Sequence, residues 1–203
     1  MAVRRRTAIL TLVTTMFTWQ SSDGRAMESA RVLLGAGGMR ALGRSVHVPL
    51  DGPTFTASYR LTVDEQGALA RLSVTSAAAD RERNLTLNRT EDGYWMLDTG
   101  SGGGRADFAG ALDVDLAYSP LYNSLPIRRL GLHRQSGDHE LPMVFVSLPT
   151  LKVELVTQCY RTVSPLDDQG RSAVHFRWDD FASELVVDEQ GMVLDYPGLA
   201  TRI

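Results

Sequence analysis

Short runs in which apolar and polar residues alternate with a period of two constrain this fold most, because only a β-strand turns such a run into one dry face and one wet face. The pattern is clear from about residue 44 onward. The first two such runs form a predicted hairpin around the turn Asp64-Glu-Gln-Gly67. They are Tyr59-Arg-Leu-Thr-Val63 and Arg71-Leu-Ser-Val-Thr75. Similar runs follow at 84–88, 94–97, 151–155 and 174–178, and 181–187 with 192–196 forms the last predicted hairpin. The sequence therefore predicts a mainly β, single-domain, antiparallel fold.

Helical signal is thin and is confined to residues 119–132, which we expect to hold a turn or a short helix with Pro126 at its first position. The fold should thus contain at most one or two short helices. The segment 61–67 is nearly repeated at 185–191. Either a strand-turn-strand unit was duplicated or the same hairpin arose twice, and we favour the second explanation because Asp-x-x-Gly turns recur for local reasons.

Charge argues against nucleic acid as a partner. The 203 residues carry a formal net charge of −3, the only lysine is Lys152, and the one basic cluster is Arg4-Arg5-Arg6. A surface that binds a duplex needs clustered cations that displace counterions from phosphates. The chain is long enough for one domain with a real core and short for two.

The N-terminal segment has three interpretations. Arg4–Arg6 followed by the apolar stretch 7–17 resembles a secretory signal, although it is too short to span a bilayer and lacks a clear cleavage site. The stretch also suits a β-strand, or residues 1–15 are an extension to a single domain over 16–203. We prefer the extension because Trp19 looks like part of the fold.

Cysteine usage bears on the compartment. The only cysteine, Cys159, cannot form an intrachain disulfide, and we interpret it as a small half-buried hydrophobe. This fits a reducing compartment, so we predict a cytoplasmic location, with secretion as the alternative if residues 1–26 act as a signal peptide.

Motifs of common catalytic and cofactor sites are missing. The sequence has no Gly-x-Ser-x-Gly elbow, no phosphate-binding loop, no complete dinucleotide fingerprint and no paired His or Cys at zinc spacing. We therefore predict no catalytic residue, no metal and no cofactor, and a protein that is not an enzyme.

The acidic pair Asp113-Val-Asp115 is the basis of the alternative hypothesis, that the protein is an enzyme. In a strand both carboxylates would face one side, where they could act as acid and base or hold a hard cation. The structural interpretation, in which they pair with Arg128 and Arg129 or cap the next turn, is favoured. A hydrolase that uses Asp113 and Asp115 stays as the second hypothesis.

One long segment is distinctive: Leu112-Asp-Val-Asp-Leu116, Ser119-Pro120 and Asn123-Ser-Leu-Pro-Ile-Arg-Arg-Leu130. It closely resembles the signature of the "Putative glycolipid-binding" family, and the resemblance runs from about Trp19 to Leu199 through Glu28, Trp95, Gln158 and Tyr196. It implies a spiral β-roll or half-barrel that is similar to the cradle of lipid carriers. It also implies non-catalytic binding of a glycolipid or other lipid-like amphipathic ligand.

If a helix only partly plugs such a cradle, an apolar trough remains for acyl chains. Guanidinium groups fork onto phosphate or sugar-acid oxygens, and carboxylates and amides bond sugar hydroxyls. The candidate ligand-binding residues are Asp113, Asp115, Asn123, Arg128, Arg129, Trp95 and Tyr196. In the competing hypothesis the charged residues form ion pairs with each other, and the protein is a scaffold that binds no ligand. We expect a monomer or a homodimer.

Overall fold

The computed structural model describes residues 13–203, and they form fifteen strands, one α-helix and one short 3-10 helix. The predicted mainly β fold is confirmed. The N-terminal strands are β1 (Val13–Ser21), β2 (Ala26–Gly35), β3 (Gly38–His47), β4 (Phe55–Val63), β5 (Leu69–Ala78), β6 (Glu82–Arg89), β7 (Trp95–Asp98) and β8 (Gly103–Ala106). The connection holds η1 (Phe108–Gly110), β9 (Asp113–Leu116) and α1 (Pro120–Leu130). The chain ends with β10 (Asp138–Val146), β11 (Val153–Ser164), β12 (Arg171–Trp178), β13 (Phe181–Asp188), β14 (Val193–Tyr196) and β15 (Ala200–Arg202).

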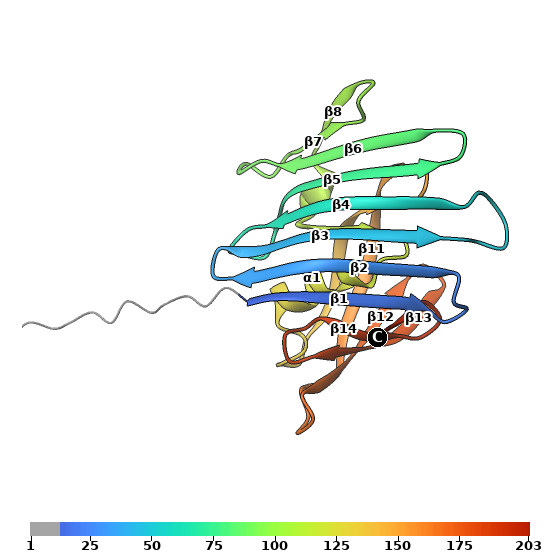
Figure 1. The fold of residues 1–203 in the computed structure, drawn as a ribbon. Helices are drawn as coiled ribbons and strands as arrows, with labels where there is room; N and C mark the ends of the chain where they lie inside the picture. The colour runs from blue at the N-terminus through green and yellow to red at the C-terminus, as the bar shows by residue number, and fades with distance from the viewer. Residues whose placement is uncertain (1–12) are drawn as a thin grey trace, which may run out of the picture.

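All fifteen strands belong to one sheet, in the order β8-β7-β6-β5-β4-β3-β2-β1-β15-β14-β13-β12-β11-β10-β9. The pairing of β1 with β15 joins the two halves of the chain. Every neighbouring pair is antiparallel except β9 with β10, which is parallel. Figure 1 shows β1 to β8 as a front layer, with α1 and the C-terminal strands behind it. The sheet thus curls around the helix, as a half-barrel does.

The strands begin earlier than the alternation predicts. β1, β2 and most of β3 precede residue 44, where the pattern becomes clear in the sequence. Several of their inward positions hold charged or small residues rather than large apolar ones, namely Glu28, Ala30, Ala41 and Gly43. The alternation of apolar and polar residues in β1 to β3 is therefore hard to see in the sequence. The C-terminal end also differs, because β15 follows the predicted last hairpin and carries the chain back to β1.

The prediction of an N-terminal extension over residues 1–15 can be compared with the structure only from residue 13 onward. Most of the proposed extension, residues 1–12, lies outside the described residues, and β1 begins at Val13. Trp19 is 1% exposed, and its indole N–H donates to the carbonyl oxygen of Val193 at 2.9 Å. No helix within residues 13–203 is long and apolar enough to cross a membrane.

Helix α1 occupies the concavity of the sheet. It starts with Pro120 in its first turn and ends at Leu130, and Gly131 caps it in the left-handed conformation (φ 67°). The expected start at Pro126 is wrong, because Pro126 lies inside the helix, where its ring nitrogen cannot donate to the preceding turn. All residues from Pro120 to Ile127 are buried, and packing on both sides compensates for this weak helical sequence.

Two apolar clusters lie against α1. The larger contains Trp19, Trp95 and the inward side chains of β1 to β6, together with Leu121 and Leu125 from the helix. The smaller contains Ile127 and the inward side chains of β11 to β14. The helix therefore fills most of the space that the curled sheet encloses.

The repeated turn has a local explanation. In Asp64–Gly67 the aspartate side chain accepts from the backbone N–H of Gln66 and of Ala68, both at 2.9 Å. Asp188–Gly191 has the same pair of bonds, and so does Asp167–Gly170, which lies outside the repeat. Three occurrences favour an independently recurring hairpin turn over duplication of a larger unit.

A candidate ligand pocket at one end of the sheet

The acidic pair of β9 is engaged by neighbouring side chains. Asp113 is 1% exposed and forms an ion pair with Arg129 of α1, whose Nε and Nη2 both donate to the carboxylate. Burial raises the pKa of Asp113, and the Arg129 guanidinium opposes that effect. The predicted pairing of this carboxylate with an arginine of the signature is thus observed.

Asp115 ends a chain of buried hydrogen bonds. The Asn123 amide donates to the Tyr160 hydroxyl (3.0 Å), which donates to Gln158 (2.9 Å), which donates to Asp115 (2.6 Å). Burial raises the pKa of Asp115 to about 6, while the bond from Gln158 opposes this. We call these residues together with Asp113 and Arg129 the carboxylate network.

The remaining predicted residues also have packing partners. Arg128 donates to the backbone carbonyl of Gln190 rather than to either aspartate. Trp95 is fully buried and bonds the carbonyl of Ala111 at 3.1 Å. Tyr196 packs edge-on against Phe176, with ring centroids 6.0 Å apart. Arg128 and Arg129 border a hollow of about 240 Å³ beside the turn Asp64–Gly67.

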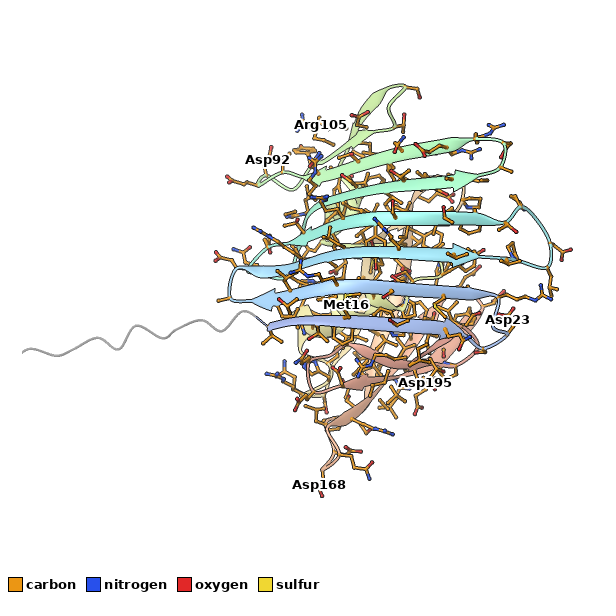
Figure 2. All side chains as sticks on the ribbon, in the orientation of Figure 1. Met16, Asp23, Asp92, Arg105, Asp168 and Asp195 are labelled. Carbon is orange, nitrogen blue, oxygen red and sulfur yellow. The ribbon has the colours of Figure 1, made fainter. Side chains whose placement is uncertain are left out.

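A larger apolar pocket lies elsewhere, where the β1–β2 turn meets the β3–β4 loop. We call it the end pocket. Its volume is about 370 Å³, and none of the seven predicted residues lines it. Its main apolar walls are Trp19, Phe55, Leu148 and Leu199, and its rim carries the exposed Asp23, Arg25 and Asp51. Figure 2 labels Asp23 at this end of the strands.

Glu28 of β2 is the one buried carboxylate in the wall of the end pocket. It is 4% exposed. Its Oε1 accepts from the Tyr59 hydroxyl and from the Ser119 hydroxyl, the latter at 2.7 Å. Its Oε2 is buried and has no hydrogen-bond partner within the described residues. Desolvation raises the pKa of Glu28 to about 7, against the two hydroxyl donors that lower it.

Gly43 makes the contact between Tyr59 and Glu28 possible. Tyr59 of β4 pairs with Gly43 of β3, and Gly43 pairs with Ala30 of β2, two residues along that strand from Glu28. A Cβ at Gly43 would lie 2.0 Å from Cζ of Tyr59. The tyrosine ring therefore lies flat across β3, and its hydroxyl reaches Glu28 two strands away.

Aromatic rings form the side of the end pocket nearest the β3–β4 loop. His47 stacks on Phe55 with ring centroids 4.5 Å apart and lies 5.5 Å from the Tyr118 ring. Burial lowers the pKa of His47 to about 4, so the ring is neutral at pH 7. Tyr118 holds a left-handed backbone (φ 67°) although it is bulky and half exposed. Such strain is common at ligand sites.

Sequence reasoning missed Glu28 although a signal was present. Glu28 occupies the same phase of β2 as Ala30 and Val32, so it is an acidic residue at an inward position. Charged residues are almost never fully buried without a partner or a function. The acidic pair 113–115 attracted attention instead because it stands in a long, distinctive motif.

Comparison with known proteins places the chain in a family. Residues 16–202 match the profile of the family described as "Putative glycolipid-binding". The chain belongs to this family. The predicted resemblance is therefore confirmed, and members of the family are expected to share the curled sheet around α1.

Two solved structures are similar to this chain. A DUF1089 family protein from Pseudomonas aeruginosa is 28% identical, with a TM-score of 0.71, and the alignment covers 88% of this chain and 92% of that one. A β-barrel-like protein with a domain of unknown function, DUF1849, from Brucella abortus is 10% identical, with a TM-score of 0.45 and 95% of each chain covered. No curated protein matches the chain.

Proposed function

We propose that the protein binds, without catalysis, a lipid-like amphipathic molecule whose hydroxyl-bearing part meets Glu28 and whose apolar part lies on the walls of the end pocket. The unpartnered Oε2 of Glu28 carries this proposal. A buried polar atom without a partner costs about 1 to 3 kcal/mol. A guest hydroxyl that donates to Oε2 would recover that cost.

The dimensions of the end pocket favour a slender guest. Ligand pockets for small molecules span about 300–1,000 Å³. At about 370 Å³ this pocket suits one sugar ring or part of one acyl chain rather than a whole two-chain glycolipid. Each methylene buried against Trp19, Leu148 or Leu199 would contribute about 0.8 kcal/mol. The family description also supports a glycolipid as the natural ligand.

The non-catalytic part of the proposal rests on the carboxylate network. A glycosidase-like reaction needs two carboxylates that flank a substrate cleft. Asp113 is held by Arg129 and Asp115 by Gln158, and neither lines the end pocket. These contacts support binding over the hydrolase hypothesis, because neither aspartate faces the end pocket.

Uptake of a fluorescent fatty acid by the full chain, and its displacement by octyl glucoside, tests the proposal. We expect saturable binding of one probe molecule and displacement by octyl glucoside but not by glucose alone. Ala26→Trp places a large ring in the end pocket and should reduce probe affinity at least tenfold. Failure of the wild-type protein to bind either amphiphile would contradict the proposal and leave the scaffold hypothesis.

The matched control is Val46→Trp. Val46 lies on the outward face of β3 near the same end of the sheet, is 50% exposed and does not line the end pocket. The same ring at this position should leave probe affinity within twofold. An equal loss in both variants would show that the added tryptophan acts through stability rather than through the pocket.

The proposal includes a cytoplasmic location. The secretion alternative with cleavage after residue 26 would remove β1, which joins both halves of the sheet. Sequencing the N-terminus of the native protein tests this point, and a mature chain that starts near Met27 would contradict it.

A further inference from the structure

The outward face of β2 to β5 concentrates positive charge. Five arginines occupy outward positions and are exposed: Arg31, Arg40, Arg44, Arg60 and Arg71. No carboxylate occupies an outward position on β1 to β5, since Glu28 points inward. None of the five arginines forms an ion pair within residues 13–203. We call this surface the arginine face.

The outward face of the C-terminal strands differs in charge. Along one row of paired residues, Asp138, Arg161, His175 and Glu184 lie side by side on β10 to β13. Acidic and basic side chains therefore lie side by side on that face. The positive sign of the arginine face is thus a local property of a chain whose formal net charge is −3.

Apolar side chains lie between the arginines. Leu42 pairs with Arg31 on one side and with Arg60 on the other. Leu42 is 42% exposed, Val46 50% and Met16 61%. Figure 2 shows Met16 on the face of the sheet that is turned to the viewer. A shallow groove of about 600 Å³ runs over this region and is bordered by Arg31, Arg44 and Arg60.

We propose that the arginine face docks the protein on the surface of a bilayer that contains anionic lipids. The arginines would approach lipid phosphates, onto which guanidinium groups fork. Met16, Leu42 and Val46 would enter the headgroup region between them. A nucleic acid fits less well, because the outward positions of β1 to β5 carry no aromatic side chain on which bases could stack.

Docking is independent of the end pocket, so it goes beyond the proposed function. The pocket opens at the strand ends, between the β1–β2 turn and the β3–β4 loop, and not on the arginine face. A protein held flat on a bilayer would keep the pocket entrance at the side of the contact, within reach of lipids at the surface.

Flotation of the full chain with vesicles tests the inference. We expect binding to vesicles of phosphatidylcholine with 30% phosphatidylglycerol, weak binding to phosphatidylcholine alone, and release by 0.5 M NaCl, because salt screens such contacts. An arginine near an anionic surface contributes about fivefold to partitioning. The double variant Arg31→Gln/Arg60→Gln should therefore partition about 25-fold less strongly.

The control is Arg161→Gln/Arg177→Gln, which removes the same charge from the outward face of β11 and β12 and should change partitioning less than threefold. The three arginines at positions 4–6 are present in every variant, so their contribution is constant. Equal losses in both double variants, or no binding of the wild-type protein to anionic vesicles, would overturn the inference. Tighter, equally charge-dependent binding to single-stranded DNA than to vesicles would overturn it in favour of nucleic acid. The Ala26→Trp variant should still bind vesicles, which separates docking from pocket occupancy.

Discussion

The carboxylate network and the end pocket both bury acidic side chains, but they complete the hydrogen bonding of those side chains differently. In the network, Asp113 receives a two-point contact from Arg129, and Asp115 accepts from Gln158. In the end pocket, Glu28 receives two donors on one oxygen and none on the other. A buried carboxylate with all its partners supplied by the protein holds elements together. One that lacks a partner beside a cavity can bind a guest.

The difference also follows from position in the fold. The network lies where α1 meets β9 and β11, so the helix covers it. Glu28 lies where the β1–β2 turn and the β3–β4 loop leave the concavity open. The helix fills the centre of the cradle, so the ligand binding that we propose takes place at its end.

The largest expected effect is on the stability of the network. Asp113→Asn leaves the guanidinium of Arg129 without its counter-charge in a site where the aspartate was 1% exposed. Removing one partner of a buried ion pair costs about 3 to 5 kcal/mol. Urea unfolding at pH 7 should show this loss, while the folded fraction should bind the fatty-acid probe with unchanged affinity.

The double variant Asp113→Asn/Arg129→Met serves as the control, because it removes both charges. Its unfolding free energy should recover at least half of the loss. If Asp113→Asn abolished probe binding in molecules that remain folded, the carboxylate network would be part of the ligand site and the comparison would fail.

A smaller effect separates the two kinds of carboxylate by pH. The folded-state pKa of Glu28 is raised from 4.5 to about 7, so its contribution to stability is fully present below pH 4.5 and is lost as the pH rises through 7. That shift corresponds to about 3 kcal/mol. Glu28→Gln cannot ionise, so its unfolding free energy should gain about 3 kcal/mol relative to the wild type between pH 4.5 and pH 8. Urea titrations across this range measure the difference.

Asp115→Asn provides the matched comparison. The pKa of Asp115 is raised from 3.8 to about 6 by the same cause, so its difference from the wild type should be complete soon after pH 6. Between pH 6 and pH 7 only the difference in unfolding free energy between Glu28→Gln and the wild type should still grow. At pH 8, where Glu28 is mostly ionised, Glu28→Gln should also weaken displacement of the probe by octyl glucoside about tenfold, because a bond to a charged acceptor contributes about 1.5 to 3 kcal/mol. If both variants gained stability relative to the wild type over the same pH range, the different pKa values assigned to Glu28 and Asp115 would be contradicted.

Much of the fold could be predicted from the sequence because alternation is a local signal. Strands such as β4 and β5 put large apolar residues in most of their inward positions, so the sequence shows which of their faces is buried. Strand β3 has Gly43 at an inward position, and only the tertiary contact with Tyr59 explains that glycine. Glu28 meets Ser119 across 91 residues of chain, a contact that no local pattern contains. The site therefore depends on proximity that arises only when the sheet curls.

The arrangement of the carboxylate network was partly predictable, because the alternation of side chains along a strand is a local signal. A spacing of two in a strand correctly indicated that Asp113 and Asp115 share a face, and Arg129 was among their expected partners. The role of Gln158 could not be inferred, because β11 reaches Asp115 only through the parallel pairing of β9 with β10.

The smallest expected effect concerns strain at the rim of the end pocket. Tyr118 adopts φ 67°, a conformation that costs a bulky residue about 1 to 2 kcal/mol and that asparagine tolerates better. Tyr118→Asn should raise the unfolding free energy by about 0.5 to 1 kcal/mol and weaken probe binding about threefold, because the ring beside His47 is lost. Tyr118→Ala removes the same ring without relieving the backbone, so it should lose affinity with no gain in stability. Thermal unfolding and probe titration of both variants measure the two effects, and equal stabilities of the two variants would show that asparagine relieves no strain at position 118.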